Sequence, residues 1–124
     1  MTYDEYNAFC SSLPATSYAL QWGNSHVWKV GGKVFAIGGW AVDRPSFTFK
    51  VTALSYDILK EQPGLRPAPY LASRGMIWIQ HFAEPGLDDL GLKDYLRHSH
   101  KIVAQGLSRK KQAALGLSAG SPRD

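Results

Sequence analysis

The stretch HVWKVGGKVFAIGGW, residues 26–40, decides the fold class. Two runs rich in β-branched and aromatic residues flank the pair Gly31-Gly32, which is the signal for a two-residue β-hairpin turn. A further run, SFTFKV at 46–51, alternates polar and apolar residues, so its strand has one apolar face and one polar face. These runs predict an antiparallel sheet that buries one of its faces.

Helical patterns stand on both sides of these strands. Thr2 and Glu5 form a capping box, and apolar residues with helical spacing follow them as far as Pro14. Further elements are predicted in this order: a strand at 17–22, the strands named above, a helix at 52–62, a strand at about 76–82, and helices at about 90–105 and 109–116. The order α-β-β-β-β-α-β-α-α predicts an α+β fold with about five antiparallel strands flanked by helices.

The bulk properties predict a small domain of a reducing compartment. The chain has 124 residues, 44% of them hydrophobic, which predicts one domain over 1–117 and a flexible tail at 118–124. The lone cysteine, Cys10, lies on the apolar stripe of the first helix, so we expect a packed thiol and a cytoplasmic protein. The N-terminus does not resemble a signal peptide, and no apolar run is long enough to span a membrane. We favour a monomer and leave the oligomeric state open.

Motifs of catalysis and cofactor binding are missing from the sequence. It contains no P-loop, no G-x-S-x-G and no C-x-x-C. His98 and His100 are two residues apart, so they point to different faces of a helix and do not predict a zinc site. Asp88-Asp89 is a typical helix N-terminus. The missing motifs lower the expectation of an enzyme, although enzymes can assemble sites from scattered residues, so a small-molecule enzyme stays open.

Positive charge is the more informative signal. The chain has fourteen Lys and Arg residues and ten Asp and Glu residues, which gives a net charge of +4. The strand region carries four cations close to Trp28 and Trp40, namely Lys29, Lys33, Arg44 and Lys50. Cations interleaved with aromatic residues suit phosphate contacts and base stacking on DNA, and they suit an ordinary amphipathic sheet equally well.

The last two predicted helices carry further cations. Lys93, Arg97 and Lys101 recur every four residues, which indicates either a solvated face or a surface for an anion. Arg109-Lys110-Lys111 falls in the first turn of the last helix, where the helix dipole disfavours cations. Either an acidic neighbour or a polyanion would compensate for that arrangement.

The loop GLRPAPYLASRG, which precedes the predicted strand at 76–82, is unusually stiff and polar. Its prolines restrict the backbone around Arg66 and Tyr70. One interpretation is a structural latch, in which Arg66 pairs with an acid and Tyr70 packs under the loop. The other is a small anion-binding groove lined by Arg66, Tyr70 and Lys50.

The blocks WKVGGKVFAI, FTFKV, GLRPAPYLASRGMIWI and YLRHSH, in this order, resemble the MmcQ/YjbR family over residues 2–117. The resemblance implies an antiparallel sheet flanked by helices, like the sandwiches of CyaY/frataxin or of secretion chaperones. It also implies no catalytic activity, no cofactor, and DNA as the partner of a double wing of β-hairpins. The positions that match the family are Lys33, Phe35, Lys50, Arg66, Pro67 and Tyr70.

Two positions depart from the family pattern. Met76 stands where many relatives have Trp, and His100 stands where they often have Tyr. A frataxin-like metal function would need an acidic ridge on the first helix, which offers only Asp4 and Glu5.

The sequence thus predicts a DNA-binding module. The candidate nucleic-acid-binding residues are Lys29, Lys33, Arg44, Lys50, Arg66 and Tyr70. The alternative is a protein–protein interaction module of the secretion-chaperone type, which would expose an apolar patch.

Overall fold

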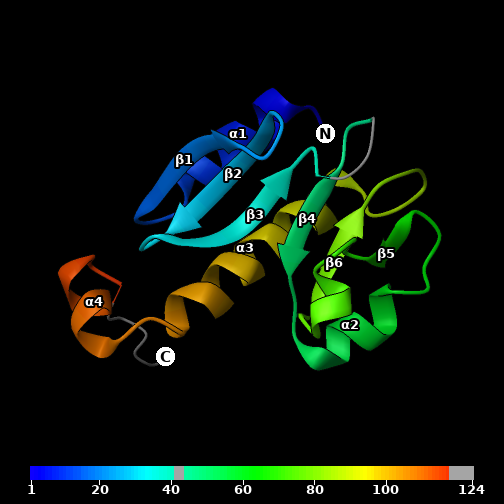
Figure 1. Ribbon diagram of the computed structural model, residues 1–124. Helices are drawn as coiled ribbons and strands as arrows, with labels where there is room; N and C mark the ends of the chain where they lie inside the picture. The colour runs from blue at the N-terminus through cyan, green and yellow to red at the C-terminus, as the bar shows by residue number, and fades with distance from the viewer. Residues whose placement is uncertain (41–43, 118–124) are drawn as a thin grey trace.

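A six-stranded antiparallel sheet organises the computed structural model, which describes residues 1–40 and 44–117 (Figure 1). The strands are β1 (Thr16–Gln21), β2 (Ser25–Val30), β3 (Lys33–Gly38), β4 (Phe47–Lys50), β5 (Leu65–Pro67) and β6 (Trp78–His81). They lie in the order β1-β2-β3-β4-β6-β5. The tail predicted at 118–124 lies outside the described residues.

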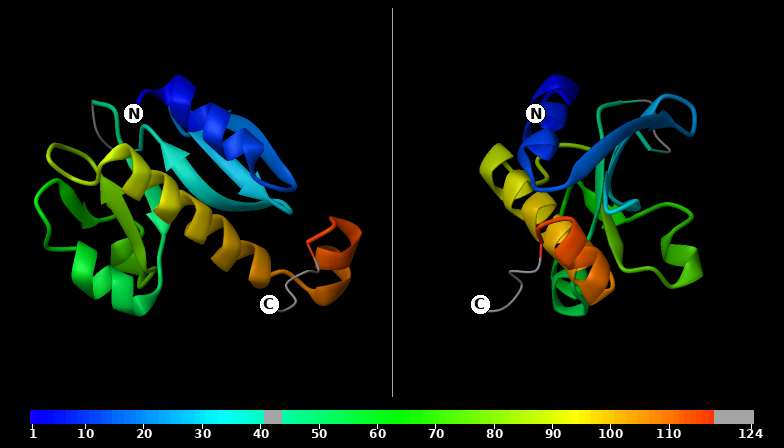
Figure 2. Two further views of the ribbon diagram at one scale, coloured as in Figure 1. Left: turned by 180° about the vertical axis from the view of Figure 1, so that it is seen from behind. Right: turned by 90° about the vertical axis from the view of Figure 1, so that its left-hand side faces the viewer.

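Four α-helices accompany this sheet, and the first three of them pack on one of its faces. They are α1 (Tyr3–Ser12), α2 (Ala53–Leu59), α3 (Asp89–Gln105) and α4 (Arg109–Ala114), with a 3₁₀ turn, η1, at Ala72–Arg74. Seen from the side, α1 and α3 lie on one side of the sheet and the segment with η1 lies on the other (Figure 2). The predicted α+β class with a helix-flanked antiparallel sheet is therefore confirmed. Among the described residues, no helix combines the length and apolar character needed to cross a membrane.

One strand was not foreseen. Leu65–Pro67, placed in a loop by the sequence, pairs with β6 and forms the edge of the sheet as β5. A proline is tolerated there because an edge strand leaves half of its backbone groups outside the ladder. The predicted strand at 76–82 is shorter than expected and leaves Met76 exposed before it.

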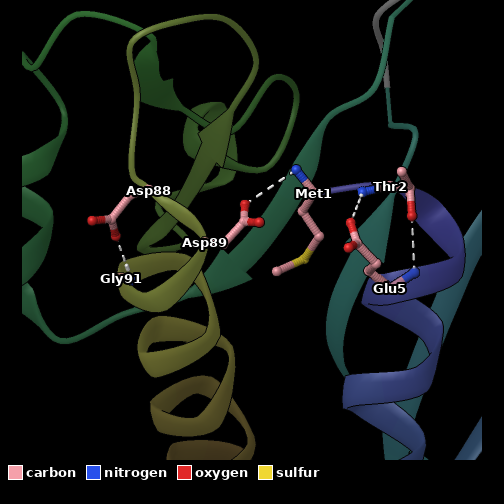
Figure 3. Close-up of polar contacts among 6 residues, drawn as sticks. All are labelled: Met1, Thr2, Glu5, Asp88, Asp89 and Gly91. Carbon is pink, nitrogen blue, oxygen red and sulfur yellow. Dashed lines mark hydrogen bonds and ion pairs between the residues drawn. The ribbon is translucent and has the colours of Figure 1, made fainter.

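The helix caps follow the sequence signals closely (Figure 3). Thr2 accepts a hydrogen bond from the Glu5 backbone, and the Glu5 carboxylate accepts one from the Thr2 backbone. Asp88 caps α3 by accepting from the Gly91 N–H at 2.7 Å. The Met1 nitrogen lies 3.1 Å from an Asp89 oxygen, so the starts of α1 and α3 are joined by an ion pair.

The main core lies between the sheet and its helices. Its largest fully buried side chains include Tyr6, Phe35, Phe49, Ile79 and Leu96. Cys10 is also fully buried in this core, as predicted, and burial raises the pKa of its thiol well above the usual value. The thiol is therefore held in its neutral form.

A single hydroxyl joins α3 to the centre of the sheet. The β3–β4 ladder ends at Ala36 with Phe49, so Phe35 and Lys50 would form its next pair. Instead, the fully buried Ser99 hydroxyl donates to the Phe35 carbonyl at 2.6 Å and accepts from the Lys50 N–H at 2.8 Å. Ser99 thus satisfies two backbone groups where the strands stop pairing.

Replacing this hydroxyl should destabilise the fold. Ser99→Ala leaves a buried N–H and a buried C=O without partners, so we expect the free energy of unfolding to fall by about 2–4 kcal/mol. Urea denaturation measures the change. Ser11→Ala, on the exposed side of α1, is the matched control and should change stability by less than about 0.5 kcal/mol. Equal stability of the two variants would contradict the assigned role of Ser99.

The buried His100 makes stability depend on pH. Its Nε2 donates to the Pro14 carbonyl at 2.8 Å, and its ring packs edge-on against Phe35. Burial lowers the pKa of His100 below its usual value, against a smaller opposing effect of the Pro14 hydrogen bond. The unfolded chain therefore takes up this proton more readily than the folded protein does.

We expect the free energy of unfolding to fall as the pH drops below the ordinary histidine pKa of about 6.5. His100→Phe should flatten this dependence, because the phenyl ring keeps the packing and does not titrate. Urea titrations across this pH range provide the measurement. His98→Gln, at an exposed position on the same helix, should leave the dependence unchanged. The same pH dependence in His100→Phe would assign it to another group, such as His81, whose pKa burial also lowers.

Candidate functional site

The side of the sheet opposite α1, α2 and α3, which we call the helix-free face, carries a row of side chains across the strands. Cross-strand register aligns Val27 with Ile37, Ile37 with Thr48, Thr48 with Gln80, and Gln80 with Arg66. Residues directly opposite in an antiparallel sheet lie on the same face. The row is apolar on β2 and β3 and becomes polar and cationic towards β5.

Gln80 is the centre of the polar half. It is fully buried, and its Oε1 accepts hydrogen bonds from Nε and Nη2 of Arg66 at 2.9 and 2.7 Å. Its Nε2 donates to the Trp40 carbonyl at 2.6 Å and to the Thr48 hydroxyl at 3.2 Å. The Arg66 guanidinium also lies 4.5 Å from the centre of the Phe82 ring. Gln80 thereby fixes Arg66 and the segment after β3 in one arrangement.

A second, smaller apolar cluster lies on this face. It is formed by Val27, Ile37, Ala68 and Trp78, and the half-buried Trp40 packs against it. The Trp40 indole N–H donates to the Pro69 carbonyl at 3.1 Å. This hydrogen bond from Trp40 thus holds the proline-rich loop against the helix-free face.

Charge is distributed unequally between the two sides of the sheet. The six strands carry Lys29, Lys33, Lys50 and Arg66 and no acid. Seven of the described acids lie on the helices or within two residues of them, at Asp4, Glu5, Asp57, Glu61, Asp88, Asp89 and Asp94, and the eighth, Glu84, lies in the loop after β6. Among the described residues, none of the four strand cations forms an ion pair.

Three of the six predicted site residues share the helix-free face. Lys50 pairs with Trp78, which belongs to the second apolar cluster, and Lys29 pairs with Val34, which packs against that cluster. Arg66 lies in the polar half of the same face. The structure thus brings together three cations from β2, β4 and β5.

Two of the other predicted residues, Lys33 and Arg44, lie elsewhere. Lys33 pairs with Val30, whose side chain belongs to the main core, so Lys33 projects from the opposite side of the hairpin. Arg44 precedes β4 and lines a cavity of about 250 Å³ with His81 and Glu84. It is therefore at the other end of β4 from Lys50.

The latch interpretation of the proline-rich loop holds in part, because Arg66 is held by hydrogen bonds, although with a different partner. Arg66 pairs with the amide of Gln80 and not with an acid, because the strands around it carry none. Tyr70 is 70% exposed and does not pack under the loop. Its ring instead meets Trp40 edge-on, with 6.1 Å between the centroids.

The Gly31-Gly32 turn, at the tip of the β2–β3 hairpin, is not a freely projecting wing of the kind that the family resemblance implies. A Cβ on Gly31 would lie 2.6 Å from Cδ1 of Leu107, so this turn packs against the segment that leads into α4. Both glycines have positive φ, as the hairpin signal predicted. Lys111, from the three cations that begin α4, lies beside Gly32 and forms no ion pair with a described residue.

The cations of α3 belong to a different surface. Arg97 pairs with Asp94 and, like Lys93, lies over the ring of Phe9. Lys101 lines a cavity of about 300 Å³ between α2 and α3. These contacts favour the solvated-face interpretation of this stripe. In the described parts of the chain, no three His, Cys, Asp or Glu side chains are close enough to hold a metal ion.

Comparison with known proteins agrees with this architecture. The family model named YjbR matches residues 11–102. The chain belongs to the YjbR family. The family expected from the sequence blocks is thus confirmed. No curated protein matches the chain.

A crystal structure with the same fold is that of the Deinococcus radiodurans protein DR2400, which carries a DUF419 domain. It shares 21% identity with this YjbR-family chain, with a TM-score of 0.80 over 94% of this chain and 88% of DR2400. At this identity, the likeness establishes the fold.

Sequence reasoning missed Gln80 and the role of Trp40. Gln80 lies two residues after Trp78 on β6 and therefore on the same face, and a polar residue following an apolar ring at this spacing was the one available signal. Its partners lie 14 to 40 residues away, so no local pattern could identify them.

Removing the Gln80 amide should destabilise this YjbR-family protein. Gln80→Leu leaves the Arg66 guanidinium and the Trp40 carbonyl without their partner, so we expect a loss of about 2–4 kcal/mol in urea denaturation. Gln62→Leu, at an exposed position, is the control and should have little effect. Unchanged stability of Gln80→Leu would show that Gln80 does not hold the two segments together.

Proposed function

We propose that this protein is a non-enzymatic module that binds DNA through the cations of its helix-free face. The observation that supports this most directly is the segregation of charge. Three of the four strand cations, Lys29, Lys50 and Arg66, share this face, and the strands carry no acid. All described acids except Glu84, in the loop after β6, lie on a helix or within two residues of one. A surface of one sign attracts a polyanion along its whole length.

The geometry of Arg66 supports the same function. Its hydrogen bonds to Gln80 use Nε and Nη2 and orient the guanidinium of this half-buried residue, while Nη1 takes no part in them. A preorganised arginine loses less entropy on binding a phosphate than a free one does. Lys29 and Lys50 extend the cationic surface along the helix-free face of the sheet.

Binding should depend strongly on salt. About four phosphate contacts give a slope of log affinity against log salt of about −3 to −4, because each contact releases counterions. Lys50→Ala should weaken binding to all sequences alike and reduce the magnitude of the slope by about one. Fluorescence anisotropy with labelled duplex and single-stranded oligonucleotides, at about 50 and about 200 mM salt, measures both.

Lys93→Ala is the matched control, since it removes the same charge from α3 on the other side of the sheet. It should leave the slope unchanged. If Lys93→Ala and Lys50→Ala weaken binding equally, the contact is not confined to the helix-free face. Absence of binding to any oligonucleotide at low salt and about 50 μM protein would reject DNA as the partner, since non-specific binding reaches this range even at physiological salt.

A protein–protein interaction module remains the second candidate, supported by one surface feature. Leu54 and Ile58 lie four residues apart on α2 and are 72% and 55% exposed. Residues with this spacing share one helix face. An apolar pair of this kind suits a partner helix, and failure of DNA binding would make this candidate the leading one.

A further inference from the structure

Three aromatic rings meet at the exposed end of the helix-free face, beyond the last residue of β3. The Trp22 and Trp40 centroids are 5.6 Å apart with their planes at 70°, and the Trp40 and Tyr70 centroids are 6.1 Å apart at 83°. Trp22 is 52% exposed and Tyr70 is 70% exposed. We call Trp22, Trp40 and Tyr70 the aromatic platform.

The two outer aromatic residues, Trp22 and Tyr70, have a backbone conformation that is unfavourable for bulky side chains. Trp22 has φ 49° and Tyr70 has φ 68°, in the left-handed region that bulky residues rarely adopt and that glycine and asparagine tolerate. The Trp22 and Tyr70 carbonyls accept hydrogen bonds from the hydroxyls of Ser25 and Ser73. Those bonds would persist with any side chain at 22 and 70. The turns themselves therefore give no reason for aromatic residues at these positions.

The two outer rings come from distant parts of the fold. Trp22 follows β1 and Tyr70 follows β5, which are the two opposite edges of the sheet. Both reach Trp40, whose carbonyl is fixed by Gln80 and whose indole N–H is fixed by Pro69. The central ring is thus held by hydrogen bonds, while the outer rings keep much of their surface open to solvent.

The surroundings of the platform carry positive charge. Gln80 connects Trp40 directly to Arg66, and Arg74 follows Tyr70 by four residues. No acid occurs in the sequence from 62 to 83, which includes this whole loop. Exposed ring faces beside cations match a ligand that offers both planar bases and phosphates.

We propose that the aromatic platform stacks unpaired bases of a single-stranded nucleic acid whose phosphates contact Arg66 and the lysines of the helix-free face. This inference rests on the proposed function and names the form of nucleic acid that the same surface binds. In a duplex, the base faces are covered by their neighbours, so the rings gain no stacking contact. In a single strand, the bases can turn out and lie on the rings.

The test compares two ligands of equal charge. One is a fluorescein-labelled single strand of about ten nucleotides, and the other is the same strand with abasic sites in place of the bases. Wild-type protein should bind the intact strand about tenfold more tightly than the abasic strand, which corresponds to one good stacking contact. Stacking should also quench tryptophan fluorescence with the intact strand alone.

The double variant Trp22→Asn/Tyr70→Asn should bind both strands with the affinity that the wild type has for the abasic strand. Asparagine suits the left-handed backbone, so this variant should fold as stably as the wild type in urea. Tyr18→Thr is the control, because Tyr18 is an exposed aromatic residue on the helix-covered side of β1. It should keep the tenfold difference.

Equal affinity of the wild-type protein for the two strands would overturn the platform, while salt-dependent binding of both would leave the proposed function standing. A destabilised double variant that keeps the tenfold difference would also overturn it, because the rings would then only cover Trp40. If neither strand binds at low salt, the proposed function fails and the platform fails with it.

Discussion

The buried hydroxyl of Ser99 fixes α3 against the sheet at the point where β3 and β4 stop pairing. It occupies the position where the β3–β4 ladder ends and supplies the partners that Phe35 and Lys50 lack. Because both groups are backbone atoms, the contact fixes the position of α3 relative to the sheet with little freedom. The main core lies under α3, and Lys50 projects its side chain to the opposite face. The contact of Ser99 on the covered side of the sheet therefore also fixes the backbone from which Lys50 projects to the helix-free face.

The parts of the fold that sequence could predict are those with local causes. The capping residues Thr2, Asp88 and Ser108 each accept a hydrogen bond from a residue three positions later, so the pattern and the structure involve the same few residues. The Gly31-Gly32 turn is local in the same way, since its φ values are set by the two glycines themselves. The resemblance to the family then indicated that the predicted strands form one antiparallel sheet flanked by helices.

The parts that sequence could not predict depend on contacts between distant residues. The edge strand β5 has three residues and a proline, so its pairing with β6 shows in no periodicity. The grouping of Lys29, Lys50 and Arg66 follows from register across five strands, and the separation of Arg44 follows from its place at the far end of β4. The face of the strand and the register of the sheet decide which cations lie on the same surface. A count of positive charges in the sequence predicts neither of them.

The pairing of Arg66 with Gln80, where an acid would be the usual partner, explains how this face remains positive. A carboxylate at position 80 could also orient the guanidinium, but it would cancel the charge of Arg66 and could not donate to the Trp40 carbonyl. The neutral amide accepts from Arg66 and donates to Trp40 at the same time. It satisfies buried hydrogen-bonding groups without adding negative charge. The orientation of the arginine, the position of the central aromatic ring and the sign of the surface potential are therefore consequences of one buried side chain.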